Sequence, residues 1–167
     1  MAYVTNMNKS FPEIERAAAI VKAIEPTHVP ETSCMLMAAA IAGMRGLTMK
    51  HIRIGALFWP AKFEHEHPDL SMRGGWGCEG FDAGSKKLYL ADTTIDDDGG
   101  FAGHTWLEPE PGDVIDLMHD NDNGMRESYG ADFTVIGRYI PRPPLERAVK
   151  KFWRRQMLAA IKAGAKT

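Results

Sequence analysis

The sequence predicts an α+β fold in which two N-terminal helices precede a run of short strands and a last helix. Apolar residues recur at helical spacing near both ends of the chain, whereas the middle alternates over short stretches separated by turn-forming residues. With 167 residues, 44% of them hydrophobic, we expect one domain spanning residues 1–167 with its own core. Strands that follow one another through short turns favour a mostly antiparallel sheet.

The first helix is predicted over Phe11 to Glu25. Ser10 is a suitable N-cap, Pro12 suits the first turn, and Glu13 stands three residues after the cap. Apolar residues on one face are expected to turn toward the core. They are Ile14, Ala17, Ala18, Val21 and Ile24.

The second helix is predicted to begin after a cap at Thr32 or Ser33 and to run to about Arg45, with Gly46 ending it. This segment is apolar almost all round, which is typical of a helix with neighbours on every side. Cys34 falls in its first turn. A thiol there meets the positive end of the helix dipole and free backbone N–H groups.

Five short strands are predicted after the second helix. They cover residues 51–59, 87–91, 102–108, 114–118 and 133–140, and residues 61–80 are predicted to be irregular. Prolines 141, 143 and 144 then break the chain before a single C-terminal helix, whose apolar face runs from Leu145 to Ala160.

Composition and charge favour a soluble protein of the cell interior. The net charge of −2 gives no overall attraction to nucleic acid or membranes, and nine basic residues after position 137 are expected to form a solvated helix face. Two cysteines cannot make a disulfide framework. The longest apolar run, Met35 to Met44, is half the length of about twenty residues that a membrane span needs. No N-terminal signal pattern is visible, so we expect a cytoplasmic location.

Three residues indicate nucleophilic catalysis. They are Cys34 at a helix start, His104 in a strand-like segment and Asp116 in the next such segment. An ordinary thiol is mostly protonated at neutral pH, so it needs a base or a positive helix end to become a thiolate. The imidazole in turn needs a carboxylate that holds its ring and tautomer. We therefore expect a Cys–His–Asp triad.

Asp113 is an alternative to Asp116 as the acid that orients the histidine. Asp113 follows Pro111 and Gly112 and suits a turn, whereas Asp116 stands inside an apolar run where a carboxylate needs a partner. We prefer Asp116 for this reason.

These motifs resemble the core of the transglutaminase-like proteins, within the wider papain-like class of cysteine enzymes. The resemblance rests on Cys34 followed by small apolar residues, on Gly46-Leu47 and Gly55, and on Gly103-His104-Thr105-Trp106-Leu107-Glu108, which is similar to the family's His-Ala-Trp-x-Glu strand. It covers residues 32–118. Leu117 departs from the proline that commonly follows the aspartate.

The resemblance implies a nucleophile helix packed on a mostly antiparallel sheet that carries the base. It also implies a cysteine-dependent hydrolase or acyltransferase that acts on a peptide, amide, ester or thioester, with catalytic residues Cys34, His104 and Asp116 and without a cofactor. An inactive binding module of the same fold is one alternative. A metal-dependent hydrolase built on His65 and His67 is another.

Several other patterns are weaker. His65, His67 and Asp69, with His119 and Asp120, have a spacing seen in metal sites, but surface histidine pairs usually bind nothing. The aspartate-rich stretches 96–100 and 120–124 lack the calcium-loop register, and we expect solvated turns. His28 is a candidate oxyanion donor but more simply a connector residue. Cys78, predicted in a loop, is a rival nucleophile without a helix start.

Overall fold

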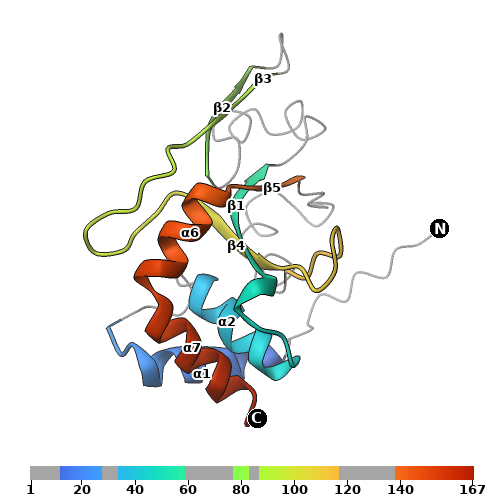
Figure 1. Ribbon diagram of the computed structural model, residues 1–167, viewed down its shortest axis with the longest axis vertical. Coiled ribbons are helices and arrows are strands. Elements are labelled where there is room, and N and C mark those ends of the chain that lie inside the picture. The colour runs from blue at the N-terminus through green and yellow to red at the C-terminus, as the bar shows by residue number, and fades with distance from the viewer. Residues whose placement is uncertain (1–11, 28–33, 59–76, 83–86, 117–137) are drawn as a thin grey trace, which may run out of the picture.

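The computed structural model describes residues 12–27, 34–58, 77–82, 87–116 and 138–167. Within these residues it contains four α-helices, a three-stranded antiparallel sheet and a separate two-stranded hairpin (Figure 1). The predicted α+β class and the antiparallel pairing are therefore confirmed.

The two predicted N-terminal helices are present with nearly the expected bounds. Helix α1 spans Pro12–Ile24 and helix α2 spans Cys34–Met44. The predicted caps, Ser10 for α1 and Thr32 or Ser33 for α2, lie outside the described residues. All positions of α2 from Met35 to Gly43 are buried, as its uniform apolar composition predicts. In Figure 1, α2 lies between α1, α7 and the sheet.

The three-stranded sheet has the order β4-β1-β5, with β1 over Ile52–Phe58, β4 over His104–Leu107 and β5 over Arg138–Pro141. Ile54 pairs with Thr105 and Leu57 pairs with Tyr139. Because side chains alternate along a strand, Ile54 and Thr105 share the face that packs on α2. Trp106 and Tyr139 lie on the other face.

The strand predictions needed correction at three places. Residues 114–118 were predicted as a strand, but the described part forms only an isolated bridge between Leu107 and Ile115. A strand β2, Cys78–Asp82, lies where residues 61–80 were predicted to be irregular, and it pairs with β3, Lys87–Leu90. A one-turn 3-10 helix, Met49–His51, precedes β1. Of the strand predicted over 133–140, residues 133–137 lie outside the described ranges.

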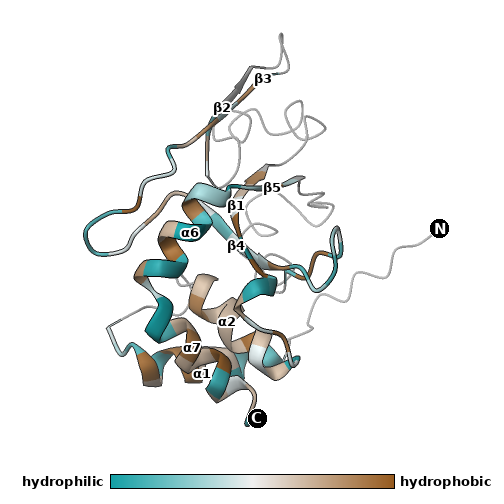
Figure 2. Ribbon diagram, in the orientation of Figure 1, coloured by the Kyte–Doolittle hydropathy of each residue, from teal (hydrophilic) through white to brown (hydrophobic). Residues whose placement is uncertain are grey.

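The prediction of a single C-terminal helix was wrong, because the structure has two helices there. Helix α6 spans Pro143–Phe152 and helix α7 spans Arg154–Gly164, with a break at Trp153. The Trp153 indole N–H donates a hydrogen bond of 2.9 Å to the Gly99 carbonyl, so tertiary contact with the 92–103 segment accompanies the break. Teal residues on the outer sides of α6 and α7 in Figure 2 reflect their basic, solvated positions.

Helices α2 and α7 approach each other closely because glycine stands at two points of contact. A Cβ atom at Gly43 would collide with the Ile161 carbonyl, and one at Gly164 would collide with the Ala40 carbonyl. This contact fixes α2, and with it Cys34, relative to the rest of the core. No described helix has the length and apolar character needed to cross a membrane.

Candidate active site

Cys34 is the first residue of α2 and is half-buried. The first-turn N–H groups of a helix have no partners within the helix, and their dipoles favour negative charge nearby. The position therefore suits a thiolate.

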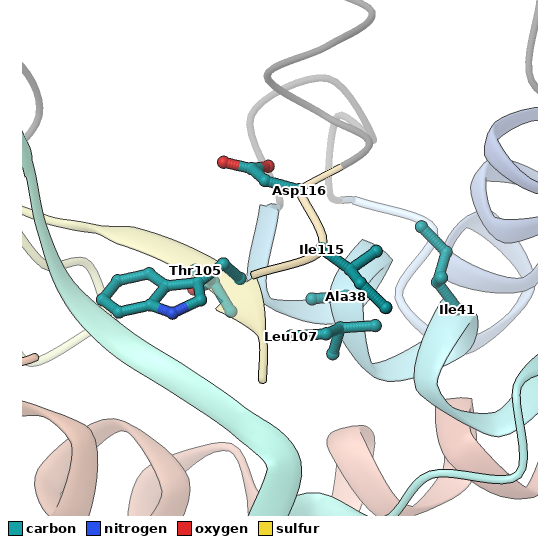
Figure 3. A pocket seen from close by; sticks show the side chains of 7 residues that line it. Ala38, Ile41, Thr105, Leu107, Ile115 and Asp116 are labelled. Atoms are coloured by element: carbon teal, nitrogen blue, oxygen red, sulfur yellow. The ribbon is translucent and has the colours of Figure 1, made fainter. Parts of the chain in front are cut away.

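His104 begins β4 and is 4% exposed. Its Nε2 atom lies 2.6 Å from Oδ2 of Asp116, which is itself 6% exposed. The segment that carries Ile115 and Asp116 runs beside β4, close to Thr105 (Figure 3). Since Asp116 lies at Nε2, Nδ1 is the ring nitrogen available for the interaction with Cys34 that helps to raise the pKa of His104.

Two opposing effects act on the Cys34 thiol. Burial raises its pKa, but the hydrogen bond and positive charge of His104, with a contribution from Thr105, more than compensate. The pKa of Cys34 is therefore lowered below the ordinary value of 9.0. The thiolate is the reactive form of cysteine, so this shift favours nucleophilic attack.

The His104 imidazole shows the matching shift. Burial by itself lowers the pKa of His104, but the hydrogen bonds with Asp116 and Cys34 and their negative charges raise it to about 9. The two shifts have one physical cause, since the thiolate and the imidazolium stabilise each other. The site thus favours a thiolate–imidazolium pair next to a carboxylate.

Thr105 is a neighbour of the thiol that the sequence did not identify. Its Oγ1 lies 3.7 Å from Cys34 Sγ, within the range for a hydrogen bond to sulfur, and the residue is 1% exposed. When Cys34 is a thiolate, the hydroxyl is the only possible donor of this pair. A threonine beside the histidine of the strand was the available signal, but only the packing of β4 on α2 reveals its contact.

Tyr139 is the second residue that the sequence did not identify. Its hydroxyl donates a hydrogen bond of 2.8 Å to Asp116 Oδ2, from a strand 23 positions further along the chain. Its ring also packs on Trp106, with centroids 5.1 Å apart. The predicted strand 133–140 contained this residue, but nothing in the sequence connected it with Asp116.

The two alternatives to these residues occupy different surroundings. Asp113 is exposed and lies in a turn closed by its own N–H and the Glu110 carbonyl at 2.9 Å. Cys78 lies in strand β2, not in the predicted loop, and burial, partly opposed by Arg142, raises its pKa to about 11. A thiol with a raised pKa is a poor nucleophile at neutral pH.

A small pocket adjoins the site along α2 (Figure 3). Most of its lining is apolar, with the Asp116 carboxylate at one side. It is lined by Ala38, Ile41, Thr105, Trp106, Leu107, Ile115 and Asp116. The Trp106 Nε1 atom is buried and has no hydrogen-bond partner within the described part of the chain.

The candidate metal ligands lie where the structure is not described. His65, His67 and Asp69 fall in residues 59–76, and His119 and Asp120 fall in residues 117–137, as His28 falls in residues 28–33. Across the described ranges no group of three His, Cys, Asp or Glu side chains could hold a metal ion.

The described site therefore joins the three residues expected from the sequence in the order Cys34, His104, Asp116, and adds Thr105 and Tyr139. This arrangement can supply a nucleophilic thiolate, an acid for a leaving group and a carboxylate that orients the imidazole. Comparison of the chain with protein-family models, curated proteins and solved structures finds no match.

Proposed function

We propose that the protein is a cysteine-dependent hydrolase or acyltransferase that forms an acyl-enzyme on Cys34. The supporting observation is that Cys34, His104 and Asp116 lie together, with 2.6 Å between His104 Nε2 and Asp116 Oδ2, and that the thiol pKa is lowered and the imidazole pKa is raised by their interaction. A helix that begins with the nucleophile and packs on an antiparallel sheet bearing the histidine also supports a transglutaminase-like or papain-like core.

The first half of the reaction forms a bond between Cys34 Sγ and the carbonyl carbon of an amide, ester or thioester. The bond from that carbon to the leaving nitrogen, oxygen or sulfur breaks, and the leaving group takes the proton of the His104 imidazolium. Free N–H groups in the first turn of α2 are suitably placed to stabilise the oxyanion of the tetrahedral intermediate.

The second half releases the acyl group. Water or an amine attacks the acyl carbon, His104 accepts the proton of the attacking group, and the carbon–sulfur bond breaks to restore the thiolate–imidazolium pair. Water gives a peptidase, amidase or esterase, and an amine gives an acyltransferase. Asp116 orients His104 and balances its charge in both halves.

Profiling of the purified full chain with a panel of peptide, ester and thioester electrophiles tests this proposal. We expect stoichiometric labelling of the wild type and of Cys78→Ala, and none of Cys34→Ala. His104→Ala should remain folded and label at least about 10²-fold more slowly, since general acid–base catalysis contributes on the order of 10²–10⁴. Equal and slow labelling of Cys34 and Cys78 by every probe would overturn the proposal and favour a non-catalytic binding module.

A further inference from the structure

We propose that Tyr139 is a positioning residue that holds the Asp116 carboxylate against His104 and adjusts how strongly that carboxylate stabilises the imidazolium. This inference deepens the proposed function and rests on it for its catalytic consequence. Its structural part concerns the contacts of Asp116 and stands independently.

The first observation is that one carboxylate oxygen accepts both hydrogen bonds. Asp116 Oδ2 lies 2.6 Å from His104 Nε2 and 2.8 Å from the Tyr139 hydroxyl. Asp116 follows Ile115, which forms an isolated bridge with Leu107, and neither residue lies in a regular strand. The backbone therefore constrains the Asp116 side chain less than strand β4 constrains the His104 side chain. A second donor on the same oxygen limits rotation of the carboxylate away from the imidazole.

The second observation is that the Tyr139 ring is itself held in place. It packs on Trp106 with ring centroids 5.1 Å apart and planes tilted by 58°. Trp106 is 1% exposed, and its strand β4 and the tyrosine's strand β5 flank β1 on either side. The hydroxyl therefore projects from a ring that is packed on the sheet, which suits a residue that positions another.

The hydroxyl also has an electrostatic effect on the pair. Among the described residues, His104 interacts with Cys34 from α2 and Asp116 from the 115–116 segment, and Tyr139 from β5 acts on it through Asp116. A hydrogen bond donated to the carboxylate compensates part of its negative charge. Without the hydroxyl, less of that charge would be compensated by other groups, so the imidazolium would be held more strongly.

Tyr139→Phe tests this inference because it removes the hydroxyl and keeps the ring. We expect the His104 titration midpoint, followed by ¹H–¹⁵N NMR of the ring nitrogens, to rise by about half a unit in this variant. Acylation of Cys34 by the best electrophile of the panel should slow by about tenfold, because a less constrained carboxylate orients the imidazole poorly. Thermal unfolding should stay close to that of the wild type. Tyr89→Phe, which alters an exposed tyrosine of the hairpin, is the matched control and should change neither quantity.

An unchanged or lowered His104 midpoint in Tyr139→Phe would overturn the inference. The proposed function has a separate criterion, which is the reactivity of Cys34 in the wild type. If wild-type Cys34 is unreactive, the function falls, whereas the NMR titration still decides whether Tyr139 acts on His104 through Asp116. If wild-type Cys34 is reactive and His104 has the same titration midpoint in Tyr139→Phe as in the wild type, the inference about Tyr139 is overturned and the proposed function stands.

Discussion

Asp116 reaches His104 from twelve residues further along the chain, with 2.6 Å between its Oδ2 and the imidazole Nε2. Two backbone hydrogen bonds of 2.9 Å between Leu107 and Ile115 hold the intervening turn against β4 and bring the carboxylate to the start of that strand. The pair is buried, so each partner compensates part of the other's charge where water cannot.

Alkylation of Cys34 should show a midpoint below the ordinary thiol pKa. His104 and Thr105 stabilise the thiolate, so iodoacetamide should react readily with Cys78→Ala already at about pH 6, where a free thiol is almost fully protonated. Cys34→Ala serves as the comparison, because the pKa of Cys78 is raised to about 11 and its labelling should accelerate only in strong alkali. A Cys34 rate that rises only above about pH 8 would indicate a structural thiol.

Acyl transfer should decline as the pH rises through about 9. His104 has its pKa raised from 6.5 to about 9, so the imidazolium that protonates the leaving group is present below that pH and is lost above it. The initial rate with a reactive ester or amide, measured from neutral to alkaline pH, checks this expectation. A rate that keeps increasing beyond pH 10 would contradict a role for the imidazolium.

Asp116→Asn should preserve the fold and reduce turnover severely, because an amide accepts a hydrogen bond but cannot stabilise the imidazolium. The equivalent change in a serine-protease triad costs about 10⁴ in turnover, and we expect a smaller loss here because the thiolate–imidazolium pair forms before the substrate binds. Asp113→Asn is the matched control. Asp113 is exposed in a turn, so the initial rate of the Asp113→Asn variant should equal that of the wild type. Inactivity of Asp113→Asn together with normal activity of Asp116→Asn would reverse the assignment of the orienting acid.

Thr105→Val should raise the pKa of Cys34 while the core keeps its shape. Valine has nearly the same volume as threonine but lacks the hydroxyl that lies 3.7 Å from Sγ and helps to lower the thiol pKa. The pH profile of Cys34 alkylation measures the shift, and Thr94→Val at an exposed position is the control. An alkylation profile identical to the wild type would show that the hydroxyl has no influence on the thiolate.

Gly164→Ala should destabilise the protein, against the usual preference of helices for alanine. In an open helix, alanine would stabilise by about 1 kcal/mol relative to glycine. Here the new Cβ would collide with the Ala40 carbonyl, and overpacking of this kind costs about 1–3 kcal/mol. Urea unfolding gives the sign directly, with Ala159→Gly on the exposed side of α7 as the control, for which a loss of about 1 kcal/mol is expected. A stabilised Gly164→Ala protein would show that α2 and α7 are not in close contact.

The parts of the fold that depend on local periodicity could be predicted from the sequence. Apolar spacing located α1 and α2, and the uniform apolar composition of α2 predicted its burial. The unfavourable burial of an unpaired carboxylate led to Asp116 as the preferred partner of His104, and the structure indeed places that side chain on the imidazole. The catalytic roles of these residues stay predictions.

Contacts between distant segments could not be predicted in this way. The break at Trp153 coincides with a hydrogen bond to Gly99, 54 positions away, and no local pattern distinguishes such a tryptophan from a helix residue. Strand β2 lies in a glycine-rich region, where pairing with β3 outweighs weak strand propensity. Thr105 and Tyr139 meet Cys34 and Asp116 only because β4 packs on α2 and because β1 sets the register of β4 and β5. The sequence by itself thus determined which residue types were available for the chemistry, since that depends on local composition and spacing. The tertiary structure decided which of them touch and how their pKa values shift, because burial and hydrogen bonding depend on segments far apart in the chain.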